Sequence, residues 1–222
     1  SEDSIPVLDS DKRLLGVITA QDIVEVVDEE MGEDYARLAG LTEEEEADEP
    51  LLKSIRKRLP WLVVLMFLGL GVSAVVGVFE SVVQSLTLIM CFQSLILDMA
   101  GNVGTQSLAV TIRTLADTGD DRPHRSLRLI GKEVRVGILN GLLLGLLSFV
   151  LVGVYILLVK GREPMLAFSV SGCIGVALLV AMTISSFTGT AIPIVFDKLH
   201  IDPAAASGPL ITTVNDLVAV VT

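Results

Sequence analysis

LPWLVVLMFLGLGVSAVVGVF, residues 59–79, is a predominantly apolar run, and it decides the class of fold. An α-helix needs about 20 apolar residues to cross the hydrocarbon core of a bilayer, and this run is long enough. Trp61 lies at one end of it, where an aromatic side chain anchors a helix at the membrane interface. The hydrophobic share of the chain, 51%, and its mean hydropathy of +0.68 agree with this. We therefore expect a membrane protein.

Toward the C-terminus, further long apolar segments predict more membrane helices. We expect a second span over about 82–115, a third over about 134–159, a fourth over about 165–196 and a fifth from about 204. The fifth is cut short at Thr222 and the chain starts in the middle of a domain, so we expect a longer polypeptide. The predicted fold is a membrane, all-α domain of five transmembrane helices with the last one incomplete.

Toward the N-terminus, short polar-flanked elements precede the membrane spans. SIPVLDSDKRLLGVIT, residues 4–19, places two β-branched runs around a polar turn, which is typical of a β-hairpin. Thr19 then offers an N-cap, and Asp22 supplies the acidic half of a capping box. The helix that follows, about 21–38, is amphipathic. One face is an apolar stripe that we expect to pack against another element, formed by Ile23, Val27 and Met31. Another face carries acids at helical spacing: Asp22, Glu25, Glu29 and Glu33.

Negative charge is concentrated in the same N-terminal part. Residues 1–50 hold 17 of the 27 acidic residues and only three basic ones, within a net charge of −11. The segment TEEEEADEP, residues 42–50, repels itself unless cations screen it. Such a surface attracts cations, divalent ones above all, and repels phosphates. The charge pattern therefore favours cation binding and argues against a nucleic acid partner.

Basic residues indicate the orientation in the membrane. Two loops carry most of them: Lys53, Arg56, Lys57 and Arg58 before the first span, and Arg113, Arg122, Arg125, Arg128, Lys132 and Arg135 between the second and third. Because basic loops stay in the cytoplasm, the acidic N-terminal side is expected there. Five spans then place the C-terminal side outside. Lys160 and Arg162, in a short outer loop, oppose this orientation mildly.

DMAGNVGTQ, residues 98–106, places polar groups inside the second span. Such groups cost several kcal/mol at membrane depth unless they are paired or hydrated. Gly101 and Gly104 would loosen the helix and free carbonyls to face a cavity, where Asn102 adds an amide. The alternative is that the glycines permit close packing and the amides bond neighbouring helices. The density of polar groups favours a functional site.

GPLITTVND, residues 208–216, is the second polar segment at membrane depth. Gly208, Thr212 and Asp216 are spaced by four, so a helix places them on one face. A carboxylate beside hydroxyls and carbonyls suits a hard cation, which prefers oxygen ligands. Asp216 could equally be a proton relay or accept a hydrogen bond at a helix end.

Other patterns have simpler interpretations. Gly137, Gly141 and Gly145 form a ridge that indicates close helix packing, within or between subunits. Cys91 and Cys173 lack a metal-binding companion. Nucleotide-binding glycine loops, a hydrolase triad and the HExxH pattern are all missing from the sequence, so nothing in it indicates an enzyme.

Two motifs in combination, AGNVGTQSL-x-x-x-IR at 100–113 and DPAAASGPLITT-x-x-D at 202–216, resemble the MgtE family of magnesium channels and transporters. The order of GVIT, acidic helix, basic loop and five spans resembles it too. The resemblance implies that 1–20 is the C-terminal fragment of a cytoplasmic α/β CBS domain. It makes 21–58 an acidic connecting or plug helix with its linker, and 59–222 the transmembrane pore domain. The expected location is the prokaryotic plasma membrane, crossed several times.

The same resemblance implies site residues and partners. Asp216 matches the pore carboxylate and Asn102 falls in the motif that lines the pore, so Mg²⁺ is the expected ion, with Thr212 and Gly208 beside it. A homodimer with its pore on the two-fold axis is expected. GVIT-x-x-D belongs to a nucleotide pocket in many CBS domains, which makes Thr19 and Asp22 candidate contacts for ATP. Asp98 is a departure, because it adds a second acid near the membrane centre.

The predicted function is a magnesium-selective channel that imports Mg²⁺ across the plasma membrane. Mg²⁺ releases its water reluctantly, so we expect the pore to hold a hydrated ion. Cytosolic Mg²⁺ would close the channel by bridging acids of the plug helix and CBS region, and the candidates are Asp22, Glu25, Asp28 and Glu29. The alternative is a secondary transporter that couples Mg²⁺ to Na⁺ or H⁺ at Asp98 or Asp216. A third interpretation is a membrane-anchored sensor that transports nothing.

Overall fold

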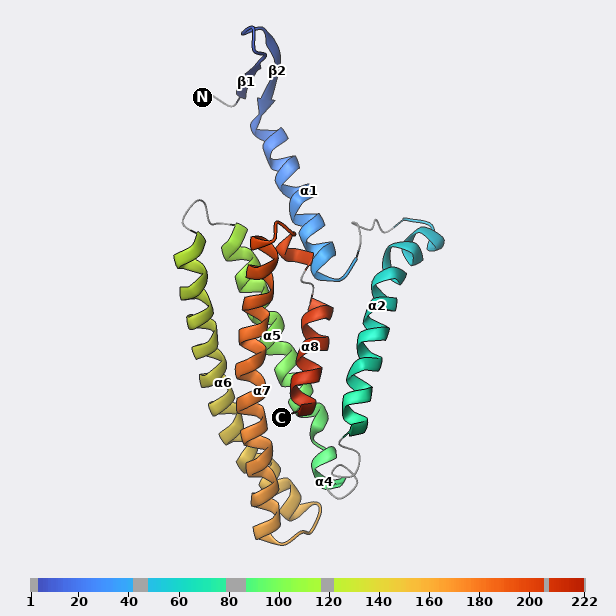
Figure 1. Ribbon diagram of the computed structural model, residues 1–222, viewed down its shortest axis with the longest axis vertical. Helices are drawn as coiled ribbons and strands as arrows, with labels where there is room; N and C mark the ends of the chain where they lie inside the picture. The colour runs from blue at the N-terminus through green and yellow to red at the C-terminus, as the bar shows by residue number, and fades with distance from the viewer. Residues whose placement is uncertain (1–3, 42–47, 79–86, 117–121, 206–207, 222) are drawn as a thin grey trace.

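The computed structural model describes residues 4–41, 48–78, 87–116, 122–205 and 208–221. The chain is mostly helical, with one two-stranded sheet at its N-terminal end (Figure 1). In chain order the elements are β1 (Ser4–Leu8), β2 (Leu14–Thr19), α1 (Ala20–Leu38), α2 (Leu51–Val78), α4 (Thr87–Met90), α5 (Gln93–Ala116), α6 (Arg122–Leu158), α7 (Pro164–Lys198), the short 3₁₀ helix η1 (Pro203–Ala205) and α8 (Gly208–Val221).

Within the described residues, four helices are long and apolar enough to cross a membrane: α2, α5 with the end of α4, α6 and α7. This confirms a helical membrane domain, although the helices do not begin at the expected residues. The first span starts at Leu51, because the basic segment before Pro60 continues the same helix. The next helix, α8, has 14 described residues, which reach only about 21 Å at 1.5 Å per residue. The expected count of five spans therefore stays a prediction.

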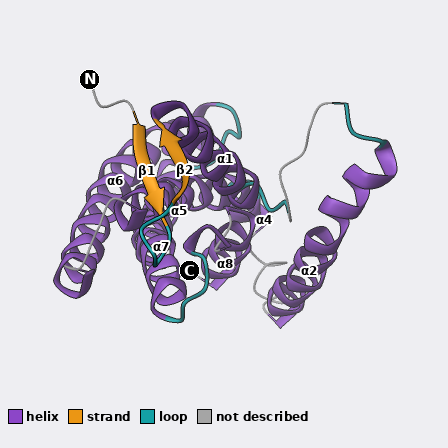
Figure 2. Ribbon diagram, turned by 90° about the horizontal axis from the view of Figure 1, so that it is seen from above, coloured by secondary structure: helices purple, strands orange, loops and turns teal. Residues whose placement is uncertain are grey.

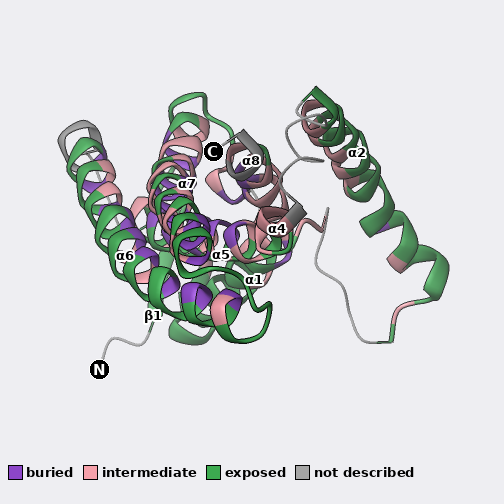
Figure 3. Ribbon diagram, turned by 90° about the horizontal axis from the view of Figure 1, so that it is seen from below, coloured by how far each residue is buried: buried purple, intermediate pink, exposed green. Residues whose placement is uncertain are grey.

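Helices α5, α6, α7 and α8 form a bundle, with α2 at one side of it and α1 above it. α7 lies at the centre of the bundle and packs against α6, α5 and α8. Seen from above, α2 stands to one side of the bundle, and the hairpin rises over the opposite part (Figure 2). Burial follows this arrangement, because the buried positions lie on the facing sides of α5, α6 and α7, whereas most of α2 is exposed (Figure 3).

The glycine ridge of α6 explains how closely α6 and α7 pack. A Cβ atom added at Gly145 would lie 2.7 Å from the carbonyl oxygen of Gly175, and one at Gly141 would lie 2.9 Å from the Cα atom of Leu179. Neither position has room for a side chain, so the two backbones touch. The prediction of close packing at Gly137, Gly141 and Gly145 is confirmed, and the contacts lie within one chain.

The second span differs from the expectation. We expected the helix to open at residues 98–106, but α5 is continuous from Gln93 to Ala116, and the break falls at Cys91 and Phe92, between α4 and α5. The prediction of an opened helix is therefore wrong. The physical reason is that Gly104 serves close packing instead: a Cβ atom at Gly189 of α7 would collide with the Gly104 carbonyl.

At the N-terminal end, the predicted hairpin and helix cap are confirmed. β1 and β2 pair antiparallel, with an irregularity between Val7 and Leu8. The Thr19 hydroxyl accepts from the Asp22 backbone N–H at 3.3 Å, and the Asp22 carboxylate accepts from the Thr19 backbone N–H at 2.7 Å. The hydrogen bonds from the backbone and hydroxyl of Thr19 hold the pKa of Asp22 below its ordinary value. This reciprocal cap starts α1 where the sequence predicted.

The apolar stripe of α1 does not pack as expected. Ile23, Val27 and Met31 are all exposed, and Ala36, near the end of the helix, is its one buried residue. α1 rises away from the bundle and touches it only at its C-terminal end (Figure 1). The prediction is wrong because the described chain brings no element alongside that stripe.

Candidate ion site

The two polar segments singled out in the sequence meet in one cavity between α5 and α8. It has a volume of about 400 Å³. Six of its eight lining residues come from the two motifs, and the other two are Ser94 and Leu97 on the same face of α5; the six are Asp98, Gly101, Asn102, Thr105, Thr212 and Asp216. On α5 the spacing from Asp98 to Thr105 follows the helical repeat, so these residues form one face. Carboxylate, amide and hydroxyl oxygens are thus gathered around one space.

Hydrogen bonds on α5 determine which atoms face that space. The Asn102 amide nitrogen donates to the Asp98 carbonyl at 2.9 Å and to the Asp98 carboxylate at 3.2 Å. Both donors of the amide are then used, and its oxygen is left as an acceptor. The Thr105 hydroxyl shares its one proton between the carbonyls of Gly101 and Asn102, at 3.2 and 3.0 Å, so its oxygen also retains acceptor capacity. α5 therefore presents oxygen atoms to the cavity.

The α8 side of the cavity is built in the same way. The Thr212 hydroxyl donates to the Gly208 carbonyl at 2.9 Å, one turn back in the helix, and Asp216 follows one turn further on. Gly208 is not among the residues that line the cavity. It lies at the start of α8 against the end of α1, where a Cβ atom would be 3.3 Å from the Leu38 carbonyl.

Asn215 is a site residue that sequence reasoning missed. It is fully buried on α8, next to Asp216 in the chain. The Thr188 hydroxyl of α7 donates to its amide oxygen at 3.1 Å, and its nitrogen donates to the Ala100 carbonyl of α5 at 3.4 Å. Asn215 therefore ties α8 to both neighbours and fixes its rotation, with Asp216 toward the cavity. The sequence did contain a signal for Asn215: it is a polar residue in an apolar helix, where a polar side chain without a partner costs free energy.

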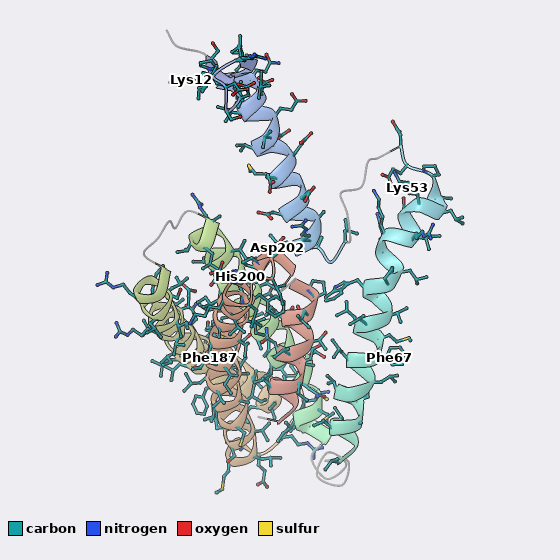
Figure 4. All side chains as sticks on the ribbon, turned by 45° about the horizontal axis from the view of Figure 1, so that its top comes forward. Lys12, Lys53, Phe67, Phe187, His200 and Asp202 are labelled. Atoms are coloured by element: carbon teal, nitrogen blue, oxygen red, sulfur yellow. The ribbon has the colours of Figure 1, made fainter. Side chains whose placement is uncertain are left out.

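The end of α1 contacts the segment that leads into α8. Arg37 forms ion pairs with Asp202, just before η1, and with Glu33 at 2.8 Å. Figure 4 labels Asp202 at the lower end of α1. Burial raises the pKa of Asp34 above its ordinary value, and the nearby charge of Asp202 adds to that shift. The end of α1 is thus linked by an ion pair to the residue just before η1.

Gly40 completes this contact. It ends α1 with a φ of +80°, which a residue without a side chain adopts at no steric cost. The Leu41 N–H donates to the Ala36 carbonyl and the Gly40 N–H to the Arg37 carbonyl, both at 2.9 Å. A Cβ atom at Gly40 would collide with the Trp61 indole of α2. α1, α2 and α8 therefore meet at this corner.

The predicted regulatory residues lie apart from the cavity. Asp22, Glu25, Asp28 and Glu29 are exposed along α1. Within the described residues, no three or more His, Cys, Asp or Glu side chains are grouped closely enough to hold a metal ion. Thr19 and Asp22, the candidate nucleotide contacts, bond each other in the helix cap. Regulation by Mg²⁺ along α1 therefore stays a prediction, and so does nucleotide binding at Thr19 and Asp22.

The structure is that of a helical membrane domain with a cavity between α5 and α8 that carboxylate, amide and hydroxyl groups line, a set of ligands that suits a small cation. Comparison with known proteins agrees: the MgtE family model, described as a divalent cation transporter, matches residues 93–222. The chain belongs to the MgtE family. The family is one of transporters and not of enzymes, so the expectation that the chain is not an enzyme is confirmed.

Individual relatives extend the similarity to nearly the whole chain. The magnesium transporter MgtE of Enterococcus faecalis is 43% identical over 217 residues, 98% of this chain and 46% of the relative. The proteins of the same name from Bacillus subtilis and Thermus thermophilus are 35% and 34% identical, covering 97% and 96% of this chain. The chain spans about half the length of the curated relatives it matches.

Proposed function

We propose that this chain forms the membrane part of a magnesium-selective channel whose ions pass the cavity between α5 and α8. The observation that carries the proposal is the meeting of Asp98, Asn102, Thr212 and Asp216 around one space. Its three relatives named above are magnesium transporters by name. Oxygen atoms from carboxylates, amides and hydroxyls are the ligands that Mg²⁺ prefers.

The cavity suits an ion that keeps its water. Mg²⁺ demands near-octahedral coordination and dehydrates reluctantly. Six waters occupy about 180 Å³ at their share of liquid volume, about 30 Å³ each, which fits within a cavity of about 400 Å³. The acceptors on α5 and α8 can then receive hydrogen bonds from the water shell while the carboxylates supply negative charge. In this account selectivity comes from the size and charge of the hydrated ion.

A second copy of the chain would complete the pathway. We propose a homodimer in the plasma membrane with its two-fold axis beside α5 and α8, so that two such faces surround one pore. Each copy would contribute Asp98 and Asp216. The hairpin and α1 would lie on the cytoplasmic side, together with the basic residues at the start of α6, and the C-terminal side would lie outside.

Regulation would act through α1. When cytosolic Mg²⁺ is plentiful, ions that bridge Asp22, Glu25, Asp28 or Glu29 to other acids would cancel repulsion and hold the helix in place. The support for this idea is the contact of α1 with Asp202, at the entry to α8. A ligand shifts such an equilibrium only through its differential affinity for the two states, so several weak sites would act together. ATP bound near Thr19 and Asp22 would act on the same helix.

One observation favours a second candidate, a secondary transporter that couples Mg²⁺ to Na⁺ or H⁺. Asp98 and Asp216 line the same cavity, so one carboxylate could hold the coupling ion while the other holds Mg²⁺. The two candidates differ in what drives the flux.

Electrical recording of the purified protein in planar bilayers tests the proposal. A channel gives unitary Mg²⁺ currents that reverse at the Mg²⁺ equilibrium potential with no Na⁺ or H⁺ gradient present. A coupled carrier gives flux that vanishes when the counter-ion gradient is removed. Absence of both current and gradient-driven flux would contradict transport by this chain and favour a sensor.

A further inference from the structure

The outer face of the α6–α7 pair carries an apolar groove of about 210 Å³. It forms because the glycines bring the two backbones into contact at Gly145 and Gly175, while larger side chains stand on either side. Leu142, Leu146 and Phe149 of α6 form one wall, and Val176 of α7 belongs to the other. Leu142 and Leu146 are exposed within the described chain. The groove is therefore an apolar trough that an extended hydrocarbon chain can fill.

Two arginines precede this groove on the same helix face. Arg128 and Arg135 stand 14 and seven residues before Leu142, with Phe149 seven residues beyond it. Intervals of seven residues are close to two helical turns, so all four side chains share one face of α6. Arg128, Arg135 and the neighbouring Lys132 are exposed. Two arginines, with Lys132 between them paired to the buried Glu133 at 3.7 Å, thus precede the apolar groove.

The arginines and the groove lie at the depths of a lipid headgroup and of its acyl chains, respectively. α6 has 37 residues, about twice the number that crosses a bilayer core. Counting about 20 residues back from Leu158 places the membrane boundary near Leu139. Arg135 then lies at headgroup level, and Phe149 is about 21 Å further along the helix at 1.5 Å per residue. The groove falls within the leaflet on the basic, cytoplasmic side, at acyl-chain depth.

We propose that this groove binds an anionic phospholipid of the cytoplasmic leaflet. Its phosphate would lie among Arg128, Lys132 and Arg135, and one acyl chain would lie along Leu142, Leu146 and Phe149. Charge complementarity favours an anionic lipid, because in a zwitterionic headgroup a positive group offsets the attraction between the phosphate and the arginines. Arginine is suited to phosphate, which it can bind through two parallel hydrogen bonds.

The chain offers variants that separate headgroup from acyl chain. R128Q combined with R135Q removes two charges from exposed positions. Gly172→Leu fills the trough, because a Cβ atom there has no neighbour closer than 3.8 Å, whereas side chains at Gly145 and Gly175 would meet backbone. Matched controls are Lys160→Gln combined with Arg162→Gln, which removes two charges from the loop between α6 and α7, and Gly71→Leu on α2, where a Cβ atom would have no neighbour within 4 Å.

Native mass spectrometry of the purified protein, with equal amounts of phosphatidylglycerol and phosphatidylcholine in mixed micelles, tests the proposal. The native protein should retain phosphatidylglycerol several-fold better. R128Q/R135Q should lose that preference, Gly172→Leu should retain less of both lipids, and the controls should behave like the native protein. Size-exclusion profiles identify variants that fail to fold.

Two results would overturn the proposal. One is equal retention of the two lipids by the native protein, or a preference that survives in R128Q/R135Q. The other is a disulfide between two copies that carry Val176→Cys in a background of Cys91→Ser and Cys173→Ser, formed in lipid bilayers, because the groove would then be covered by protein. Neither result bears on Mg²⁺ transport, so this inference and the proposed function can fail separately.

Discussion

The Asn215 side chain lies in the space that a side chain on Gly104 would occupy. A Cβ atom added to Gly104 of α5 would collide with the Asn215 amide nitrogen and would lie 2.7 Å from the Ser185 hydroxyl. Gly104, the second glycine of the AGNVGTQ motif, thus makes room for the Asn215 amide that holds α8. Asp216 follows Asn215 in the chain. The two sequence motifs therefore pack against each other with complementary shapes, and both line the cavity.

Gly104→Ala should therefore destabilise the bundle and impair transport. Overpacking of a filled site costs about 1–3 kcal/mol, and the displaced amide would lose its bond to Ala100. Thermal unfolding in detergent and Mg²⁺ uptake would measure both effects. Gly131→Ala is the control, because nothing lies within 4 Å of a Cβ atom there and alanine is favoured in helices. Equal unfolding temperatures for the two variants would contradict the packing account.

Replacements of Asp98 separate its charge from its hydrogen bond. At about 8 Å, a divalent ion gains about 1 kcal/mol from a carboxylate even in water. Asp98→Asn keeps an oxygen for the Asn102 amide but loses the charge, so the Mg²⁺ concentration for half-maximal uptake should rise about fivefold. Asp98→Ala should also lower the maximal rate, because Asn102 loses a partner. If only Asp98→Ala is impaired, Asp98 positions Asn102 and adds no charge to the pathway.

The contact between α1 and the entry to α8 has a built-in reporter. Trp61 is the one tryptophan of the chain and lies against Gly40. Arg37→Gln removes the ion pair with Asp202, so the end of α1 should loosen and the Trp61 emission should shift to the red. The charge exchange Arg37→Asp with Asp202→Arg should restore the native spectrum. An unchanged spectrum in Arg37→Gln would show that this ion pair does not hold the corner together.

Removal of Mg²⁺ should release α1 if the proposed regulation holds. With EDTA, repulsion among its carboxylates returns, and protease cleavage within α1 should become faster. In the triple variant Glu25→Gln, Asp28→Asn, Glu29→Gln, cleavage should respond much less to EDTA. A triple variant that responds as strongly as the native protein would place the regulatory ions elsewhere.

Local features were the most predictable from the sequence. The hairpin and the Thr19–Asp22 cap depend on residues close together in the chain, and both were predicted correctly. The membrane helices were predicted because apolar length is a strong signal. Helical spacing placed Gly208, Thr212 and Asp216 on one face of a helix, and the structure shows that Thr212 and Asp216 line the cavity whereas Gly208 does not. The structure adds that Asp98 and Asn102 line the same cavity.

Features that depend on packing could not be predicted. Whether Gly104 opens a helix or lets another helix approach depends on Gly189, far away in the chain, and the sequence does not place the two together. The role of Asn215 likewise required its partner Thr188. The apolar stripe of α1 was wrongly predicted to be buried, since an apolar pattern predicts a buried face but does not say which element covers it.

Uptake of Mg²⁺ into proteoliposomes, comparing the native protein with Asp216→Asn at matched reconstitution, tests the central claim most directly. Glu163→Gln, at the start of α7, serves as the control for loss of one acidic charge. If ions pass between α5 and α8, uptake by Asp216→Asn should fall to the level of empty liposomes, while the control keeps native uptake. Native uptake by Asp216→Asn would contradict the account and remove this carboxylate from the ion pathway.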